Sequence, residues 1–298
     1  AALYHVLLSG QLDMQMAMQQ FAAGSLRRLA GDLLALSQRQ EEIAGQIPAE
    51  MRGVDTAELR RRQHRLLKAA QSLRDRLQAT GGGSALMMMR LLRDMDGLLG
   101  ELAGAAGSLD RSAGPEARRE ARDSLAAMNR MVIAMLTAAQ QVSPSAGGGG
   151  GAAASSRQLQ QMAREQAGLN AMADRLQRQL QERGLSQEAR ARMERLQSDQ
   201  SGLAGRLRDL DAEEHAAPER GRLLGDLEEI AREMERIGRD LGAGQFGEET
   251  LRRQERILSR LLDAHNSVRQ RDYTERRESR SAQRLFAPQA GEPPAAAD

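Results

Sequence analysis

The stretch LLGDLEEIAREMERIGRDL, residues 223–241, contains the pattern that decides the fold of this chain. Its apolar residues alternate between spacings of four and three, and charged residues fill most positions between them. The apolar residues are Leu223, Leu227, Ile230, Met234, Ile237 and Leu241. This heptad spacing places their side chains on one stripe of an α-helix, which is buried by packing against other helices.

Similar stripes recur along most of the chain, and Gly or Pro residues separate them. They span residues 26–47, 59–77, 88–102, 121–139, 159–180, 189–210 and 251–268. Aromatic residues make up only 2% of the chain and Trp is absent, which argues against a thick core and is typical of long helices with narrow apolar stripes. The sequence therefore predicts an all-α fold, a helical bundle built from antiparallel coiled-coil hairpins.

The two halves of the chain repeat the same plan, and a Gly, Ala and Ser linker separates them. The pattern predicts a duplicated four-helix unit. Because the chain begins within a helical pattern, without Met or a helix cap, we interpret it as a C-terminal fragment. The predicted regions are a remnant of an upstream helix at 1–23, a first helical-hairpin unit at 24–142, a linker at 143–156, a second unit at 157–275 and a disordered tail at 276–298.

Four glutamines, Gln40, Gln63, Gln166 and Gln200, occupy core positions of the predicted stripes. Folding each helix pair back at its loop sets Gln40 against Gln63 and Gln166 against Gln200. A slipped register would bury an unpartnered amide at a cost of about 1–3 kcal/mol, so we interpret these pairs as register pins. The alternative is that glutamine, which is frequent here, falls at core positions by chance.

No group of residues is spaced for catalysis or for binding a metal or cofactor. The chain has no Cys, and His5, His64, His215 and His265 are far apart in sequence. Neither Glu-x-x-His nor His-Glu-x-x-His occurs, and the glycine runs lack the Gly-Lys-Ser/Thr of a phosphate-binding loop. We therefore predict a non-enzymatic protein without cofactor, metal or small-molecule substrate. His265 lies on an apolar stripe, and we expect it to be a partly buried structural residue or to face solvent, rather than to be a ligand.

Charge and hydropathy give no sign of nucleic-acid binding or of a membrane span. The net charge is only +2, with both signs interleaved. The longest apolar run, residues 131–139, is about half of the ~20 residues that span a bilayer. We expect partner proteins or self-association through helical faces instead.

Two clusters have competing interpretations. The first would bring methionines of the third and fourth predicted helices together: Met87, Met88, Met89, Met95, Met128, Met131 and Met135. Core filling is the favoured interpretation and an adaptable binding groove is the alternative. The second is an arginine-rich run at 269–284, where a solvated helix end is favoured over a weak contact with anionic lipid or nucleic acid.

The segments LGDLEEIAREME (224–235), EETLRRQERILSRLLDA (248–264), RDY (271–273) and RRES (276–279) resemble the C-terminal end of a bacterial family. Members of this family are large membrane-anchored proteins of unknown function, with N-terminal transmembrane helices followed by a long Gln-rich helical region. The resemblance is closest over residues 157–280. Two departures are the lack of a membrane segment and the presence of His265 and Asn266 where Gln and a small or charged residue are expected.

The resemblance implies a membrane-associated protein of the cell envelope, anchored through segments upstream of this chain. Together with the heptads, it leads us to predict a non-enzymatic coiled-coil scaffold or interaction region of such a protein. The alternative is a cytoplasmic coiled-coil protein involved in nucleic-acid or chromosome organisation, supported only by the arginine-rich run. An enzyme hidden in the Met-rich half is a third possibility, which would need a pocket between the third and fourth helices.

Overall fold

A computed structural model of the protein describes residues 2–48, 50–51, 54–80, 84–142, 151–216 and 227–286. All regular structure within these ranges is helical, which confirms the predicted all-α class. The helices are α1 (Ala2–Gln46), α2 (Ala57–Gln78), α3 (Ala85–Asp110), α4 (Gly114–Val142), α5 (Gly151–Arg183), α6 (Gln187–His215), α7 (Leu227–Gly242) and α8 (Glu248–Phe286).

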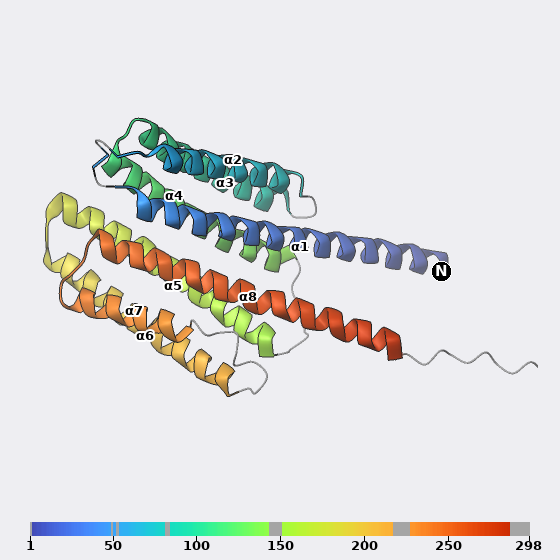
Figure 1. The fold of residues 1–298 in the computed structure, drawn as a ribbon. Coiled ribbons are helices and arrows are strands. Elements are labelled where there is room, and N and C mark those ends of the chain that lie inside the picture. Colours follow the sequence, from blue (N-terminus) through green and yellow to red (C-terminus); the bar gives the residue numbers. More distant parts are fainter. Residues whose placement is uncertain are drawn as a thin grey trace, which may run out of the picture.

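The helices form two bundles of four (Figure 1). In the first bundle, α1 and α3 each pack on both α2 and α4, so the four helices close a ring. In the second bundle, α5 and α7 each pack on both α6 and α8. Each ring encloses the apolar stripes of its helices.

The heptad stripe of the opening segment is buried as its spacing predicts. On α7, the side chains of Leu227, Ile230, Met234, Ile237 and Leu241 are all at most 3% exposed, while Leu223 lies outside the described residues. The methionines of α3 and α4 also fill the core: Met95, Met128, Met131 and Met135 are buried. Met89, by contrast, points to solvent and is 60% exposed.

Two tight turns reverse the chain before α4 and α8 by the same motif. After α3, the backbone amide of Ala113 donates to the backbone carbonyl of Ser108 over 2.9 Å. Ser112, two residues past the end of α3, has a φ of 57°. After α7, the backbone amide of Gln245 donates to the backbone carbonyl of Asp240 over 2.8 Å, and Gly244 has a φ of 72°. Both turns leave a residue in the left-handed region, as a Schellman cap requires.

The observed helix ends differ from three predicted boundaries. Helix α1 runs unbroken through the boundary at 23/24, because Ala22, Ala23 and Leu26 are all buried on its core face. Helix α5 begins at Gly151, inside the predicted linker 143–156, because the following alanines are the strongest helix formers. Helix α8 continues to Phe286 rather than ending near Arg276, in a sequence rich in Arg and Glu, which also favour helix. Residues 143–150 and 287–298 lie outside the described residues.

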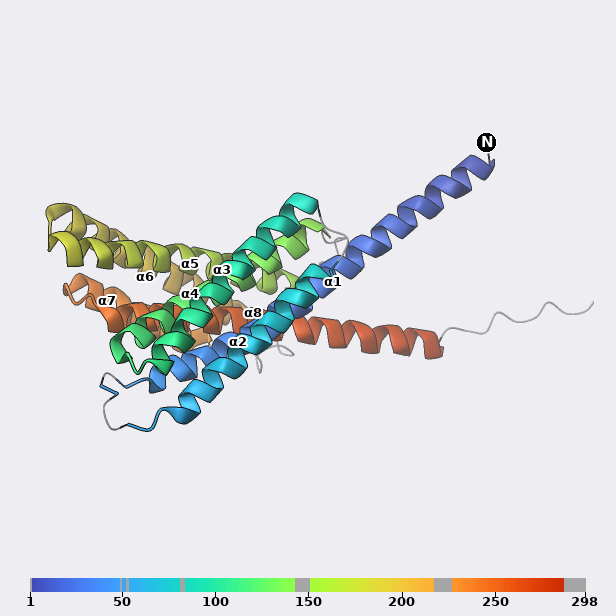
Figure 2. The same ribbon diagram turned by 90° about the horizontal axis from the view of Figure 1, so that it is seen from above.

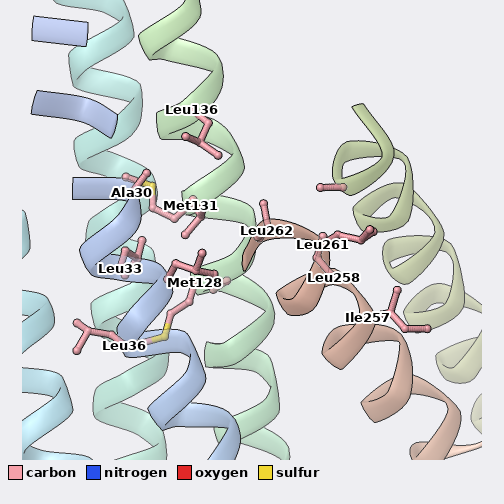
Figure 3. Packing of buried hydrophobic residues seen from close by; sticks show 14 of the residues in the cluster. Ala30, Leu33, Leu36, Met128, Met131, Leu136, Ile257, Leu258, Leu261 and Leu262 are labelled. Carbon is pink, nitrogen blue, oxygen red and sulfur yellow. The ribbon is translucent and has the colours of Figure 1, made fainter. Parts of the chain in front are cut away.

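The two bundles dock side by side through α8. This helix packs on α1 and α4 of the first bundle, and α4 also touches α5. Figure 3 shows Leu262 on the side of α8 that faces α4, whereas Leu261 and Ile257 lie on the side that faces the second bundle. The two apolar cores are therefore continuous. Seen from above, the N-terminal part of α1 and the C-terminal part of α8 extend beyond the bundles (Figure 2).

Candidate functional site

The predicted glutamines of the second bundle meet across its core. Both Gln166 on α5 and Gln200 on α6 are fully buried. The Nε2 of Gln200 donates to the Oε1 of Gln166 over 2.9 Å, and Gln166 donates to Asn170 over 2.8 Å and to Gln200 over 3.4 Å. Each amide therefore has a partner on the facing helix, at the position where the sequence places the pair.

The glutamines of the first bundle are buried too, but no hydrogen bond joins them within the described part of the chain. The Nε2 of Gln40 donates over 3.2 Å to the backbone carbonyl of Ala121 on α4, where the short alanine side chain leaves that carbonyl accessible. The Nε2 of Gln63 donates to the carbonyl of Leu102 on α3 over 3.5 Å. Both Oε1 atoms are buried without a partner. The expected pairing of Gln40 with Gln63 is thus replaced by contacts to the other two helices.

This difference predicts rises of different size in the melting temperature of two double variants. Gln40→Leu with Gln63→Leu removes two unpartnered acceptors, each costing about 1–3 kcal/mol, and is expected to raise the melting temperature. Gln166→Leu with Gln200→Leu removes a paired contact and is expected to raise it less, while loosening the helix register. Thermal unfolding and amide hydrogen exchange of both variants measure these effects. A lower melting temperature for the first variant would contradict the interpretation of its unpartnered oxygens.

A polar contact that the sequence analysis missed joins the two bundles. Asn129 on α4 and Asn170 on α5 donate to the two carboxylate oxygens of Glu255 on α8, over 3.1 and 2.9 Å. Burial raises the pKa of Glu255, partly offset by these two donors. Nearby, burial also raises the pKa values of Asp123 and Asp174. The sequence did carry one indication of this contact, the asparagine Asn129 within the apolar face of α4. A polar side chain in a core needs a hydrogen-bond partner.

Three further contacts cross the same interface. Gln38 on α1 donates to Asp263 on α8 over 2.8 Å, and Arg256 on α8 pairs with Glu41 on α1 over 2.9 Å. At the start of α8, Glu248 pairs with Arg122 on α4 at 3.3 Å. Apolar contacts and directed polar bonds therefore together fix how the bundles are placed, since polar groups restrict the geometry that apolar packing leaves open.

A surface groove of about 620 Å³ lies between α5 and α6. Its apolar lining comes from Leu169, Met172 and Leu203, and an ion pair between Glu165 and Arg206 lies at its edge. Two lining residues on facing helices are glycines, Gly168 and Gly202, and an added Cβ at either would meet no atom within 4 Å. The glycines therefore leave room for another chain to approach the backbone closely.

The histidines do not converge. His265 is 4% exposed within the core, His64 lies 3.1 Å from Asp110 on the surface, and His215 lies 3.4 Å from Asp211. The side chain of His5 is outside the described residues. In the described ranges, no three His, Asp or Glu residues are grouped to hold a metal ion. No helix in these ranges has the length and hydropathy needed to span a membrane.

Comparisons with protein-family models, with curated proteins and with solved structures found no match to this chain.

Proposed function

We propose that this region is a non-enzymatic scaffold of a membrane-anchored bacterial envelope protein, made of two coiled-coil-like bundles that form one rigid body. The groove between α5 and α6 carries this proposal, because it combines an apolar floor with charged edges. Such a groove is suited to the apolar face of an amphipathic helix. The envelope assignment derives from the family resemblance of residues 157–280.

The chemistry of the groove suggests the kind of helix that it binds. Gly168 and Gly202 allow a partner backbone to come close, and Met172 offers an adaptable apolar contact. Asp199 lines the groove, and within the described residues no hydrogen bond or ion pair involves it. An amphipathic helix of another protein, with Arg or Lys beside its apolar stripe, is the occupant that this surface fits.

Filling the groove is expected to abolish partner binding without destabilising the bundle. Gly202→Leu places a side chain in the groove and, since glycine costs about 0.8–1 kcal/mol in a helix interior, should maintain or raise stability. Gly205→Leu is the matched control, because Gly205 lies on the same helix, has no atom within 4 Å of an added Cβ and does not line the groove. A photo-crosslinking residue at Met172 in cells that express the parent protein measures occupancy.

We expect the Met172 crosslink to a second protein to fall at least tenfold in Gly202→Leu, about 1.4 kcal/mol or more of lost binding, and to persist in Gly205→Leu. Equal crosslinking in both variants would rule out the groove as the docking site. An adduct between two copies of this chain would contradict the proposal of a different partner.

The envelope assignment has its own test. An epitope at the C-terminus of the parent protein is followed through protease treatment of intact cells, spheroplasts and lysed spheroplasts. Cleavage in spheroplasts before lysis supports an envelope scaffold outside the inner membrane. Protection until lysis, or recovery in the soluble fraction, would contradict it.

The arginine-rich run does not favour a second candidate function. Arg269, at its start, points into the bundle interface and is partly buried, which is a poor position for contact with nucleic acid. The side chains of residues 271–284 lie outside the described part of the chain.

A further inference from the structure

Four basic side chains converge where α8 lies between the two bundles. His265 and Arg269 are one turn apart on α8, and Arg164 on α5 and Arg27 on α1 approach from either side. The antiparallel register of α1 and α8 explains the position of Arg27. Glu41 pairs with Arg256, Gln38 bonds to Asp263, and a Cβ on Gly31 would lie 3.8 Å from the side chain of Asn266. Continuing this register sets Arg27 beside Arg269.

Among the described side chains, no carboxylate pairs with the three arginines of this cluster. Three acidic side chains near these residues in sequence are engaged elsewhere: Asp32 with Arg76, Glu165 with Arg206 and Asp263 with Gln38. The side chain of Asp272, three residues after Arg269, lies outside the described residues. Within the described residues, Arg164 donates to two neutral oxygens, those of Thr137 at 2.9 Å and Gln140 at 3.0 Å. Among the described side chains, no hydrogen bond or ion pair involves Arg27.

Two nitrogens of the cluster, the Nδ1 of His265 and the Nη1 of Arg269, are buried and have no hydrogen-bond partner among the described residues. Leaving a buried charged donor unpaired is costly, and an anion removes most of that cost. The cost is visible in the pKa of Arg269, which burial and then the charge of Arg27 lower to about 10.

We propose that Arg27, Arg164, His265 and Arg269 bind a phosphate group between α1, α5 and α8. Guanidinium groups match the oxygens of phosphate in bidentate geometry, and a doubly charged anion balances several uncompensated cations better than one carboxylate does. Access is graded: Arg164 is exposed, Arg27 and Arg269 are partly buried, and His265 is 96% buried, being only 4% exposed. Arg164 is therefore the donor of the cluster that solvent reaches most readily.

Thermal unfolding of the full chain in inorganic phosphate, against sodium chloride at matched ionic strength, tests this site. Phosphate at ten times its dissociation constant is expected to raise the melting temperature by roughly 2 °C or more over chloride. In Arg269→Met this rise should disappear, while the melting temperature in chloride stays the same or increases because an unpaired buried cation is gone. Arg61→Gln, at a surface position 72% exposed on α2, should keep the full phosphate response.

An equal phosphate response in Arg269→Met and the wild-type chain would overturn the proposal, as would no response beyond chloride. Cosedimentation with phosphatidic acid vesicles and with phosphatidylcholine vesicles identifies the source of the phosphate. Binding to phosphatidic acid that Arg269→Met abolishes assigns the site to a lipid headgroup. A response to free phosphate without vesicle binding assigns it to a soluble phosphate compound.

Discussion

Replacing Leu262 with alanine is expected to lower the free energy of unfolding by about 2–5 kcal/mol, the range for truncating a fully buried leucine. Leu262 is 0% exposed and lies on the side of α8 that faces α4, with Met131 and Leu136 on that helix (Figure 3). The truncation leaves a cavity at the contact between the two bundles. Chemical denaturation followed by circular dichroism measures the loss.

The matched control is Leu185→Ala in the turn between α5 and α6, where the leucine is 56% exposed. Its effect is expected to stay within about 0.5 kcal/mol, as for most surface substitutions. A loss for Leu262→Ala as small as that of the control would mean that the contact between the bundles does not contribute to stability.

Stability of the wild-type chain is expected to fall relative to His265→Gln as the pH drops. Burial, followed by the charges of Arg269, Arg164 and Arg27, lowers the pKa of His265 from 6.5 to about 4. Above pH 6.5 the imidazole is neutral in both the folded and unfolded states, so its contribution to the free energy of unfolding is fully present there. Between pH 6.5 and 4 the unfolded state takes up a proton that the folded state does not, and the loss is on the order of 3 kcal/mol.

The comparison uses denaturation of both proteins at pH 7.5 and at pH 4, in a phosphate-free buffer. Carboxylates with raised pKa values titrate in both proteins, so their contribution cancels in the difference. His64→Gln is the control for removing an imidazole from the surface, since His64 is about half exposed beside Asp110. A pH-independent difference between wild type and His265→Gln would show that His265 is not held neutral.

Helices and their buried faces were predictable because heptad spacing is a local property of the sequence. The stripe at 227–241 is buried residue by residue, and Gln166 meets Gln200 because one helix pair and its turn set their register. Gln40 does not follow the same rule, since its nearest acceptor comes from α4, 81 residues away in the chain. Whether either pair fixes the register stays a prediction.

The contact between the bundles was beyond prediction, because residues far apart in the sequence create it. Asn129 and Glu255 are separated by 126 residues, and Gln38 and Asp263 by 225. The sequence around either residue of these pairs does not indicate its partner. The groove between α5 and α6 is lined by Gly168 from one helix and Gly202 from the other, and spacing along one helix does not reveal that they share a groove. The convergence of Arg27 with Arg269 likewise depends on the docked arrangement.

The claim that the two bundles form one rigid body is tested most directly by a crosslink across α1 and α8. Because the chain has no cysteine, Gln38→Cys with Asp263→Cys introduces the only thiols, at side chains that are 2.8 Å apart. A short bifunctional thiol reagent should join them rapidly within one molecule in native buffer and not in denaturant. Leu86→Cys with Leu185→Cys places two exposed thiols in different bundles as the control pair. Crosslinking of the first pair no faster than the control pair would contradict a rigid docked scaffold.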